Sequence, residues 1–294
     1  MFNNIIGNPP YQDPQNARFP LWQKFFQKSI DQLVKDGHMI NVHPGNWRKP
    51  DHKLLEVFKS VNLTYLNINS PSDGMKAFGC STRYDWYYLN KCDYSGSTYI
   101  VDQDDVCGYY NILKMPFIPN GKIDLIMSLI AKPDEEKTEV IHSYSAYETR
   151  KPHVSKEKTE VLYSRSAYGS DKKHVSKEKT GGFIYPCIHA TKSKDIVYCF
   201  SNTDKNGHFG IPKVILGLGN VKNPFIDTNG NFGMTQNCFG IVTEDMENIS
   251  KCFKSKKFQI LIPYLTWSGM ALDFRVFLFI RKDFWKEFVC SQSK

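Results

Sequence analysis

Apolar residues over the first ninety positions are spaced so that strands and helices alternate. Residues 1–7, Met-Phe-Asn-Asn-Ile-Ile-Gly, predict a short strand that ends in a turn. Between residues 19 and 35, apolar side chains recur at helical spacing, and Asp36-Gly37 predicts the end of that helix. The run 38–42 then predicts a short buried strand, closed by a His-Pro-Gly turn.

The alternation continues to residue 90. Residues 51–60 predict a second helix, and residues 61–68 alternate well enough for a strand. The segment Ser70-Pro-Ser-Asp-Gly74 predicts a turn, and the aromatic-rich residues 83–89 predict another strand. This order is typical of a doubly wound α/β sheet, in which ligands bind at the carboxyl ends of strands.

The C-terminal part predicts mainly β structure with short helices. A helix is expected at 247–258, and Asn229-Gly230 predicts a two-residue hairpin turn. The segment Gly217-Leu-Gly-Asn220 follows a strand, but no helical periodicity comes after it, so it predicts a loop rather than a cofactor-binding turn. The expected strands are 183–189, 196–201, 214–217 and 238–242.

A tandem repeat separates these two parts, because residues 138–158 resemble residues 159–179. The repeat is rich in Lys, Ser and Glu, and two interpretations stay open: a duplicated surface hairpin or flexible insert, and a basic arm that lies along DNA. In the second interpretation the phosphate contacts come from Lys151, Arg165, Lys172 and Lys173. The repeat therefore divides the chain into an N-terminal part at 1–134, an insert or linker at 135–180 and a C-terminal part at 181–294.

Composition sets broad limits on the class of protein. The 294 residues are enough for two domains, and a hydrophobic content of 41% is ordinary for a globular protein. The net charge of +8 suits a polyanion such as nucleic acid, although a mildly basic surface without such a partner has the same charge. No signal peptide is visible and the apolar run 276–280 is too short to span a bilayer, so we expect an intracellular protein with no membrane contact.

The eight cysteines form no C-x-x-C pair, which argues against a zinc ribbon or a redox motif. Free thiols in a reducing compartment are the expected state. Cys187, His189, Cys199 and His208 could be grouped as a metal set, but their spacing matches no common site. We therefore predict no metal ligands.

The candidate chemistry lies in Asn8-Pro9-Pro10-Tyr11, directly after the first predicted strand. An exocyclic amino nitrogen is a poor nucleophile because its lone pair is delocalised into the ring. Hydrogen bonds from that amino group to the Asn8 side-chain oxygen and the Pro9 carbonyl would free the lone pair. Two prolines, Pro9 and Pro10, stiffen the turn, and Tyr11 offers a face on which a flipped base can stack.

Three N-terminal segments carry a resemblance to a known family. Residues 2–12 resemble the catalytic motif of restriction-modification adenine-N6 DNA methyltransferases, and residues 37–47 and 78–91 resemble that family's following blocks. The resemblance implies S-adenosylmethionine as methyl donor, double-stranded DNA as partner, base flipping, and Phe78 as a second stacking group. Members often carry Asp where Asn3 or Asn4 stands.

The C-terminal part is similar to the target-recognition region of the same enzymes. The similarity lies in residues 185–192, 211–215, 233–242 and 258–288. A positive face toward the duplex would come from lysines in this part, although each alone is also a common solvated side chain. The lysines are Lys192, Lys194, Lys205 and Lys213.

The cofactor-binding residues stay unassigned. In this family the glycine-rich cofactor motif precedes Asn-Pro-Pro-Tyr, whereas here the motif already stands at residue 8. The sequence therefore predicts a partial doubly wound, Rossmann-like methyltransferase sheet joined to a mixed, mainly β target-recognition domain. The cofactor half would come from a second chain or be lost.

Three functional classes remain open. The first is a site-specific DNA adenine-N6 methyltransferase, active alone or with a cofactor-binding partner. The second is a non-catalytic DNA-binding or structural derivative of such an enzyme. The third is a protein-glutamine methyltransferase, since release-factor methyltransferases carry the same Asn-Pro-Pro-Tyr; the recognition-like C-terminal part and the Phe78 block argue against it.

Overall fold

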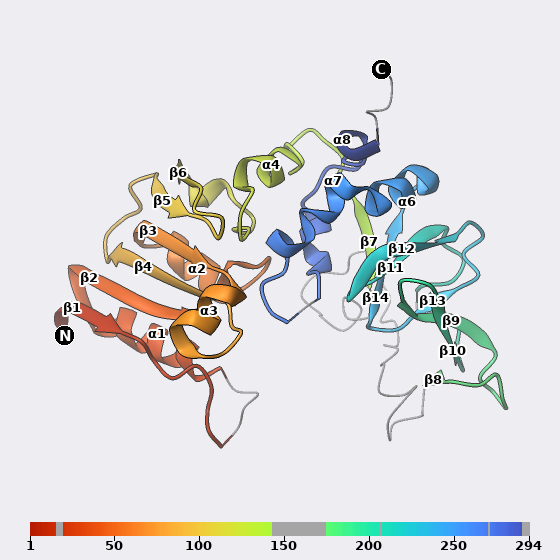
Figure 1. Cartoon of the computed structure of the whole chain (residues 1–294), viewed down its shortest axis with the longest axis horizontal. Coiled ribbons are helices and arrows are strands. Elements are labelled where there is room, and N and C mark those ends of the chain that lie inside the picture. Colours follow the sequence, from red (N-terminus) through yellow and green to blue (C-terminus); the bar gives the residue numbers. More distant parts are fainter. Residues whose placement is uncertain (16–19, 143–174, 206, 270, 290–294) are drawn as a thin grey trace. The chain divides into compact units, whose positions relative to one another are not determined.

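The computed structural model describes residues 1–15, 20–142, 175–205, 207–269 and 271–289. The chain divides into two compact units (Figure 1). Unit 1 comprises 1–128 and 263–269, and unit 2 comprises 129–262 and 270–294. Most of the tandem repeat lies outside the described residues, including the four basic residues Lys151, Arg165, Lys172 and Lys173.

Unit 1 is built on a six-stranded sheet with the strand order β1-β2-β4-β3-β5-β6. The pairs β1/β2 and β3/β5 are parallel, whereas β4 runs antiparallel to both β2 and β3. The sheet is therefore mixed, which is consistent with the predicted partial doubly wound methyltransferase sheet. The strands are β1 (Phe2–Gly7), β2 (Leu33–Pro44), β3 (Asn62–Asn69), β4 (Tyr84–Asn90), β5 (Thr98–Val101) and β6 (Cys107–Tyr110).

Helices α1 (Leu21–Gln32) and α2 (Lys53–Lys59) pack their apolar stripes on one face of this sheet. Phe26 of α1 and Phe58 of α2 stack at 4.6 Å between ring centroids, and both contact Tyr87 of β4. These side chains are fully buried, so this face carries the core of unit 1. The shorter helices are η1 (Gly45–Arg48), η2 (Ile112–Lys114) and α4 (Ile123–Ser128).

A further helix, α3 (Pro71–Phe78), occupies the segment where the sequence predicted a turn. Ser70 and Asp73 form a capping box: the Ser70 hydroxyl accepts the Asp73 N–H at 3.3 Å, and the Asp73 carboxylate accepts the Ser70 N–H at 3.1 Å. Gly79, at φ +69°, ends the helix. Ser70 and Asp73, which predicted a turn, thus form the N-terminal cap of a helix, so the turn prediction was wrong.

Unit 2 contains two four-stranded sheets, ordered β13-β9-β10-β8 and β12-β11-β14-β7. It is mainly β, as the sequence predicted. The strands are β7 (Glu139–His142), β8 (Val175–Ser176), β9 (Tyr185–Thr191), β10 (Ile196–Ser201), β11 (Lys213–Gly217), β12 (Asn220–Asp227), β13 (Gly233–Met234) and β14 (Cys238–Val242). Strand β7 lies in the predicted insert but pairs with β14, so the boundary near 134 differs from the observed division at Leu129.

Two local predictions in this unit are corrected. The helix expected at 247–258 is split into α6 (Met246–Lys254) and α7 (Lys256–Gln259), because Ser255 caps the second piece. The turn at Asn229-Gly230 does not close a hairpin: the Asp227 carboxylate accepts the N–H groups of Asn231 and Phe232, and the chain passes to the other sheet. The remaining helices are η4 (Ile262–Leu265), η5 (Phe274–Leu278) and α8 (Lys286–Val289).

Candidate functional site

The Asn8–Tyr11 motif directly follows β1 at its carboxyl end. Asn8 is exposed, whereas Tyr11 is half-buried and packs against the core of unit 1. Because β1 and β2 are parallel, their carboxyl ends meet at one edge of the sheet. This brings Pro44, the last residue of β2, and Asn46, which follows β2, into the same cavity as Tyr11.

The Tyr11 hydroxyl is enclosed and, among the described residues, has no hydrogen-bond partner. Burial is the main reason why the pKa of Tyr11 rises to about 12. The phenol therefore stays protonated at neutral pH and keeps an unused donor. A buried polar group without a partner is costly, so this hydroxyl is a candidate for a ligand contact.

Tyr11 and Phe78 lie together, although they are far apart in the sequence. Their ring centroids are 6.2 Å apart with an interplanar angle of 76°, and Phe78 also contacts Tyr84 edge to face at 4.9 Å. Phe78 is 39% exposed, so its ring is accessible to a ligand. The two rings are nearly perpendicular, and a base stacked flat on Tyr11 would meet Phe78 at an edge unless one ring rotates.

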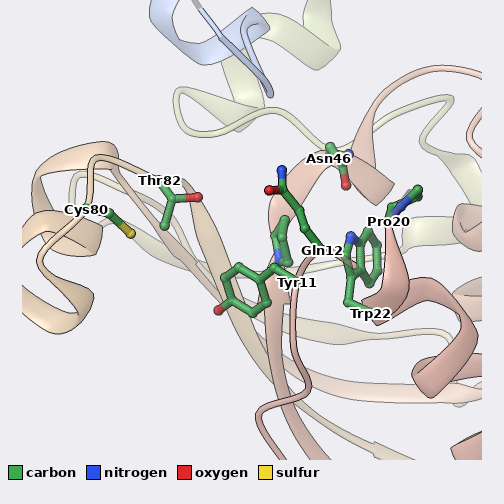
Figure 2. A pocket seen from close by; sticks show the side chains of 8 residues that line it. Tyr11, Gln12, Pro20, Trp22, Asn46, Cys80 and Thr82 are labelled. Carbon is green, nitrogen blue, oxygen red and sulfur yellow. The ribbon is translucent and has the colours of Figure 1, made fainter. Parts of the chain in front are cut away.

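A cavity of about 570 Å³ opens beside Tyr11 (Figure 2). Figure 2 shows Tyr11 and Gln12 between Thr82 and Cys80 on one side and Trp22 and Pro20 on the other. This volume is within the range of small-molecule sites. Its lining comes from Tyr11, Gln12, Pro20, Trp22, Pro44, Asn46, Cys80 and Thr82.

A buried ion pair holds the wall that follows β2. The Arg48 guanidinium donates to the Asp85 carboxylate from Nε at 2.7 Å and from Nη2 at 3.0 Å, and both side chains are fully buried. Arg48 also donates to Asn120 Oδ1 at 2.9 Å and to the Ile118 carbonyl at 3.0 Å. Burial raises the pKa of Asp85 and the Arg48 charge opposes that shift. The fully satisfied network fixes η1, which carries Asn46, against β4.

Trp22 is held at the cavity by His43 of β2. The two rings stack with centroids 4.3 Å apart, and the His43 Nδ1 lies 3.1 Å from the Pro44 carbonyl. Burial lowers the pKa of His43 to about 3, so its imidazole is neutral at physiological pH. An imidazole that donates to a neighbouring carbonyl fixes the start of the Pro44–Asn46 wall.

The predicted recognition lysines divide into two groups in unit 2. Lys192, Lys194 and Lys205 are exposed. Lys213 is fully buried, and its Nζ donates to Asp227 Oδ2 at 2.7 Å and to the His208 carbonyl at 2.8 Å. The prediction that Lys213 faces the duplex is therefore wrong, because all five residues of β11 are buried and its charge is neutralised inside the unit.

No cofactor or metal ligand set is assigned. Among the described residues of unit 1, no glycine-rich turn stands beside β1, so none is matched to S-adenosylmethionine. In the described part of the chain, no group of three or more His, Cys, Asp or Glu side chains is placed to hold a metal ion. The seven described cysteines are free thiols. No described helix is both long and apolar enough to cross a membrane.

Sequence reasoning missed several residues that line the cavity, among them Trp22, Asn46 and Thr82. A signal existed for Asn46, since it follows the strand parallel to β1 and the same carboxyl-end rule applies to it. Cys80 and Thr82 reach the cavity only because α3 folds the chain back toward β4. Because the sequence predicted a turn in place of α3, it did not place these two residues at the cavity.

Comparison with known families gives one match. Residues 1–67 match the model of the Methyltransferase small domain, a segment that contains β1, Asn8–Tyr11, α1, β2 and α2. The matched segment is less than a quarter of the chain. Together with the motif it supports a methyltransferase. A search of curated proteins found no match.

Similar solved structures come from restriction-modification systems. One is the type IIL enzyme MmeI in complex with DNA, with 7% identity over 94% of this chain and 45% of that chain, at a TM-score of 0.48. Another is the ATP-dependent type ISP enzyme LlaBIII bound to DNA. It has 10% identity over 81% of this chain and 24% of that chain, at a TM-score of 0.37. A chain of a type I restriction-modification system has 14% identity over 34% of this chain and 23% of that chain, at a TM-score of 0.27. The chain thus spans less than half the length of these proteins, and similarity at this level assigns no function.

Proposed function

We propose that this chain is the catalytic-loop and recognition part of a DNA adenine-N6 methyltransferase. The observation that carries the proposal is the exposed Asn8 directly after the carboxyl end of β1, three residues before Tyr11, which lines the cavity. Asn8 and the Pro9 carbonyl accept hydrogen bonds from the adenine amino group, and Tyr11 contacts the flipped base. S-adenosylmethionine, when bound, supplies the methyl group to that nitrogen.

The proposed role of the remaining residues follows from the cavity. Phe78, which contacts Tyr11, meets the base at an edge, while Trp22, Pro44 and Asn46 of the cavity lining close the other side. These aromatic and apolar surfaces exclude water from the amino group, which strengthens its hydrogen bonds to Asn8. Exposed lysines of unit 2, such as Lys192, contact phosphates of the duplex.

We further propose that a second polypeptide supplies the S-adenosylmethionine site. In support, β1 is an edge strand of the described sheet, so a further strand can add beside it. The alternative is a non-catalytic DNA-binding derivative, which would keep the positive face of unit 2 but not the cofactor. A glutamine methyltransferase would need no DNA-facing lysines.

Calorimetric titration of S-adenosylmethionine into the purified chain is the first test, followed by transfer of a radioactive methyl group to unmodified duplex DNA. Micromolar binding with methylation of adenine supports an enzyme that needs no partner. Binding and transfer that occur only in the presence of a second chain support the split enzyme. DNA binding without cofactor binding in any assembly would favour the non-catalytic derivative.

A further inference from the structure

Arg83 is a half-buried cation whose partners in the described part of the chain are neutral. Its Nη1 donates to the side-chain oxygen of Gln103, and its Nη2 donates to the Pro263 carbonyl at 3.4 Å. The other arginines that the structure describes each form an ion pair with a carboxylate; they are Arg48, Arg275 and Arg281. The charge of Arg83 is therefore held in place without being neutralised by a described residue.

Arg83 stands at the edge of the sheet where the candidate site lies. It directly precedes β4, and the register places Tyr84, the first residue of β4, opposite Pro44 at the end of β2. The residue before it, Thr82, lines the cavity, and the residue after it, Tyr84, contacts the ring of Phe78. Arg83 is thus one residue from the cavity wall and one residue from a ring that contacts Phe78.

The groups that hold Arg83 lie on the side of the sheet away from β1. Gln103 follows β5, and β2, β4 and β3 stand between β1 and β5 in the strand order. Pro263 belongs to the segment 263–269 of unit 1, where Asn120 Nδ2 donates to its carbonyl at 3.0 Å. The position of the guanidinium is therefore set by residues remote from β1.

The charges around Arg83 sum to a positive value. Arg48 and Asp85 neutralise each other in their buried ion pair, and the Arg83 guanidinium adds a positive charge near that pair. Burial and the charge of Arg48 lower the pKa of Arg83 to about 10, so its guanidinium stays charged at neutral pH. A partly buried charge without a counter-ion is costly, and binding of an anion removes that cost.

The geometry of a guanidinium suits a phosphodiester. Arginine carries five N–H donors in a planar fork that matches two phosphate oxygens, and Arg83 uses only some of them in its contacts with Gln103 and Pro263. The phosphates of a nucleotide are joined to its base through the sugar, so they stay outside a cavity that the base enters. Contacts to phosphate fix the position of a nucleic-acid strand and carry no sequence information directly.

We infer that Arg83 is a substrate-binding residue that holds a backbone phosphate of the nucleotide whose base enters the cavity. The contact fixes the sugar-phosphate chain beside the cavity wall, so that the base is presented in one position to the groups that line it. The inference rests on the proposed function in one respect, namely that the cavity takes a nucleobase. A phosphate site at Arg83 does not depend on methyl transfer.

The test measures binding of the trinucleotide dA-dA-dA to the purified full chain, followed by tryptophan fluorescence because Trp22 lines the cavity. No target sequence is needed, since each base of a single strand can enter the cavity. Replacing both phosphodiesters by uncharged methylphosphonates should weaken binding to the wild-type chain by roughly tenfold, the usual effect of losing a hydrogen bond to a charged group. Arg83→Gln should bind the unmodified trinucleotide about as weakly, and methylphosphonates should then cause no further loss.

Two further variants control this comparison. Lys76→Gln removes a cation of unit 1 that is paired with Asp73 at 3.3 Å, and it should leave both affinities unchanged. Arg83→Lys keeps the charge but loses the planar fork, so it should bind more weakly than the wild type and more tightly than Arg83→Gln. Urea titration checks that each variant is folded, and Arg83→Lys carries the test if Arg83→Gln is not.

Equal sensitivity of the wild type and Arg83→Gln to methylphosphonates would overturn the inference, because the contacted phosphate would then lie elsewhere. Tyr11→Ala separates the inference from the proposed function. If Tyr11→Ala binds the trinucleotide as tightly as the wild type and the Arg83 effect persists, the proposed function fails and the phosphate site stands. If Tyr11→Ala abolishes binding and methylphosphonates do not affect the wild type, the inference fails and the cavity still takes the base. A wild-type chain that does not bind the trinucleotide would overturn both.

Discussion

Gly74 of α3 faces the carbonyl oxygen of Thr82 so closely that a β-carbon at Gly74 would lie 2.0 Å from that oxygen. Thr82 lines the cavity, and Gly74 sits on the helix that ends in Phe78. The close approach therefore sets both the position of the second aromatic ring and one wall of the candidate site. Neither could be placed correctly with any larger residue at position 74.

Gly74→Ala should accordingly lower the free energy of unfolding of unit 1 by about 1–3 kcal/mol, the usual cost of overpacking a tight contact. Denaturant titration followed by tryptophan fluorescence measures it, since Trp22, Trp47, Trp86 and Trp267 lie in unit 1. Lys76→Ala on the same helix is the control and should change stability by less than about 0.5 kcal/mol, because Lys76 is exposed. Equal stability of the two variants would contradict the tight contact.

Asn8→Ala tests the catalytic proposal. Asn8 is exposed, and in its proposed role it accepts a hydrogen bond from the amino group, so methyl transfer should fall on the order of 100-fold or more while DNA affinity and stability stay nearly constant. Initial rates of radioactive methyl transfer and fluorescence anisotropy with duplex DNA measure the two effects. Gln12→Ala, at an exposed neighbour on the cavity wall, is the control and should lose far less activity. A parallel loss of binding and transfer in Asn8→Ala would assign it a structural role.

His43 should make unit 1 sensitive to acid. Its pKa is lowered from 6.5 to about 3 by burial, so between these values the unfolded chain binds a proton that the folded chain excludes. The stabilisation is complete above pH 6.5 and is lost as the pH falls toward 3, at about 1.4 kcal/mol per pH unit.

His43→Asn should therefore flatten the dependence of the unfolding free energy on pH between 4 and 6, even though loss of the Trp22 stack lowers stability overall. Urea titrations at a series of pH values give the slope. His38→Asn is the control on the same strand, since His38 is exposed. An unchanged slope in His43→Asn would show that other groups carry the acid sensitivity.

Much of unit 1 was predictable because its signals are local. The apolar spacing predicted α1 and α2, and the strand runs predicted β1, β3 and β4, each within a few residues. The predicted helix end at Asp36-Gly37 was wrong, because β2 begins at Leu33, five residues before the strand predicted at 38–42. The antiparallel sense of β4 was not predictable in this way, because spacing along one strand carries no information on the direction of its neighbours. The helix α3 was missed because its N-terminal Ser-Pro-Ser-Asp signal also occurs in turns.

The site was predictable only where the residue types of a motif themselves indicate a chemistry. Asn8 and Tyr11 were predicted from their residue types and Phe78 from the resemblance, and the structure brings Tyr11 and Phe78 together. The Arg48–Asp85 pair that fixes the opposite wall was not foreseen, since its partners lie on separate elements and meet only in the folded sheet. Lys213 was misread for the same reason: its sequence neighbours do not reveal that β11 is buried throughout.

The burial of Lys213 leads to a stability prediction. Lys213→Met removes one partner of a buried ion pair and leaves the Asp227 carboxylate without its cation, at a cost of about 3–5 kcal/mol. Thermal and denaturant unfolding measure the loss. Lys213→Met combined with Asp227→Asn should recover part of it, because the uncompensated charge is then gone. A double variant no more stable than Lys213→Met alone would argue against the ion pair as the source of the loss.

If unit 2 contacts the duplex, substitutions of Lys192 and of Lys213 should differ in their effect on DNA binding. A lysine that touches a phosphate contributes about 0.9 to the slope of log affinity against log salt concentration, through release of bound cations. Lys192 is exposed, so Lys192→Gln should weaken binding to any duplex sequence and lower the slope by about that amount. Lys213 is sealed inside unit 2, so the Lys213→Met, Asp227→Asn double variant should leave the slope unchanged once it is confirmed to be folded. Anisotropy titrations between low and moderate salt distinguish the two. If the double variant lowers the slope and Lys192→Gln does not, the duplex contacts a surface other than the β9–β10 turn, in which Lys192 stands.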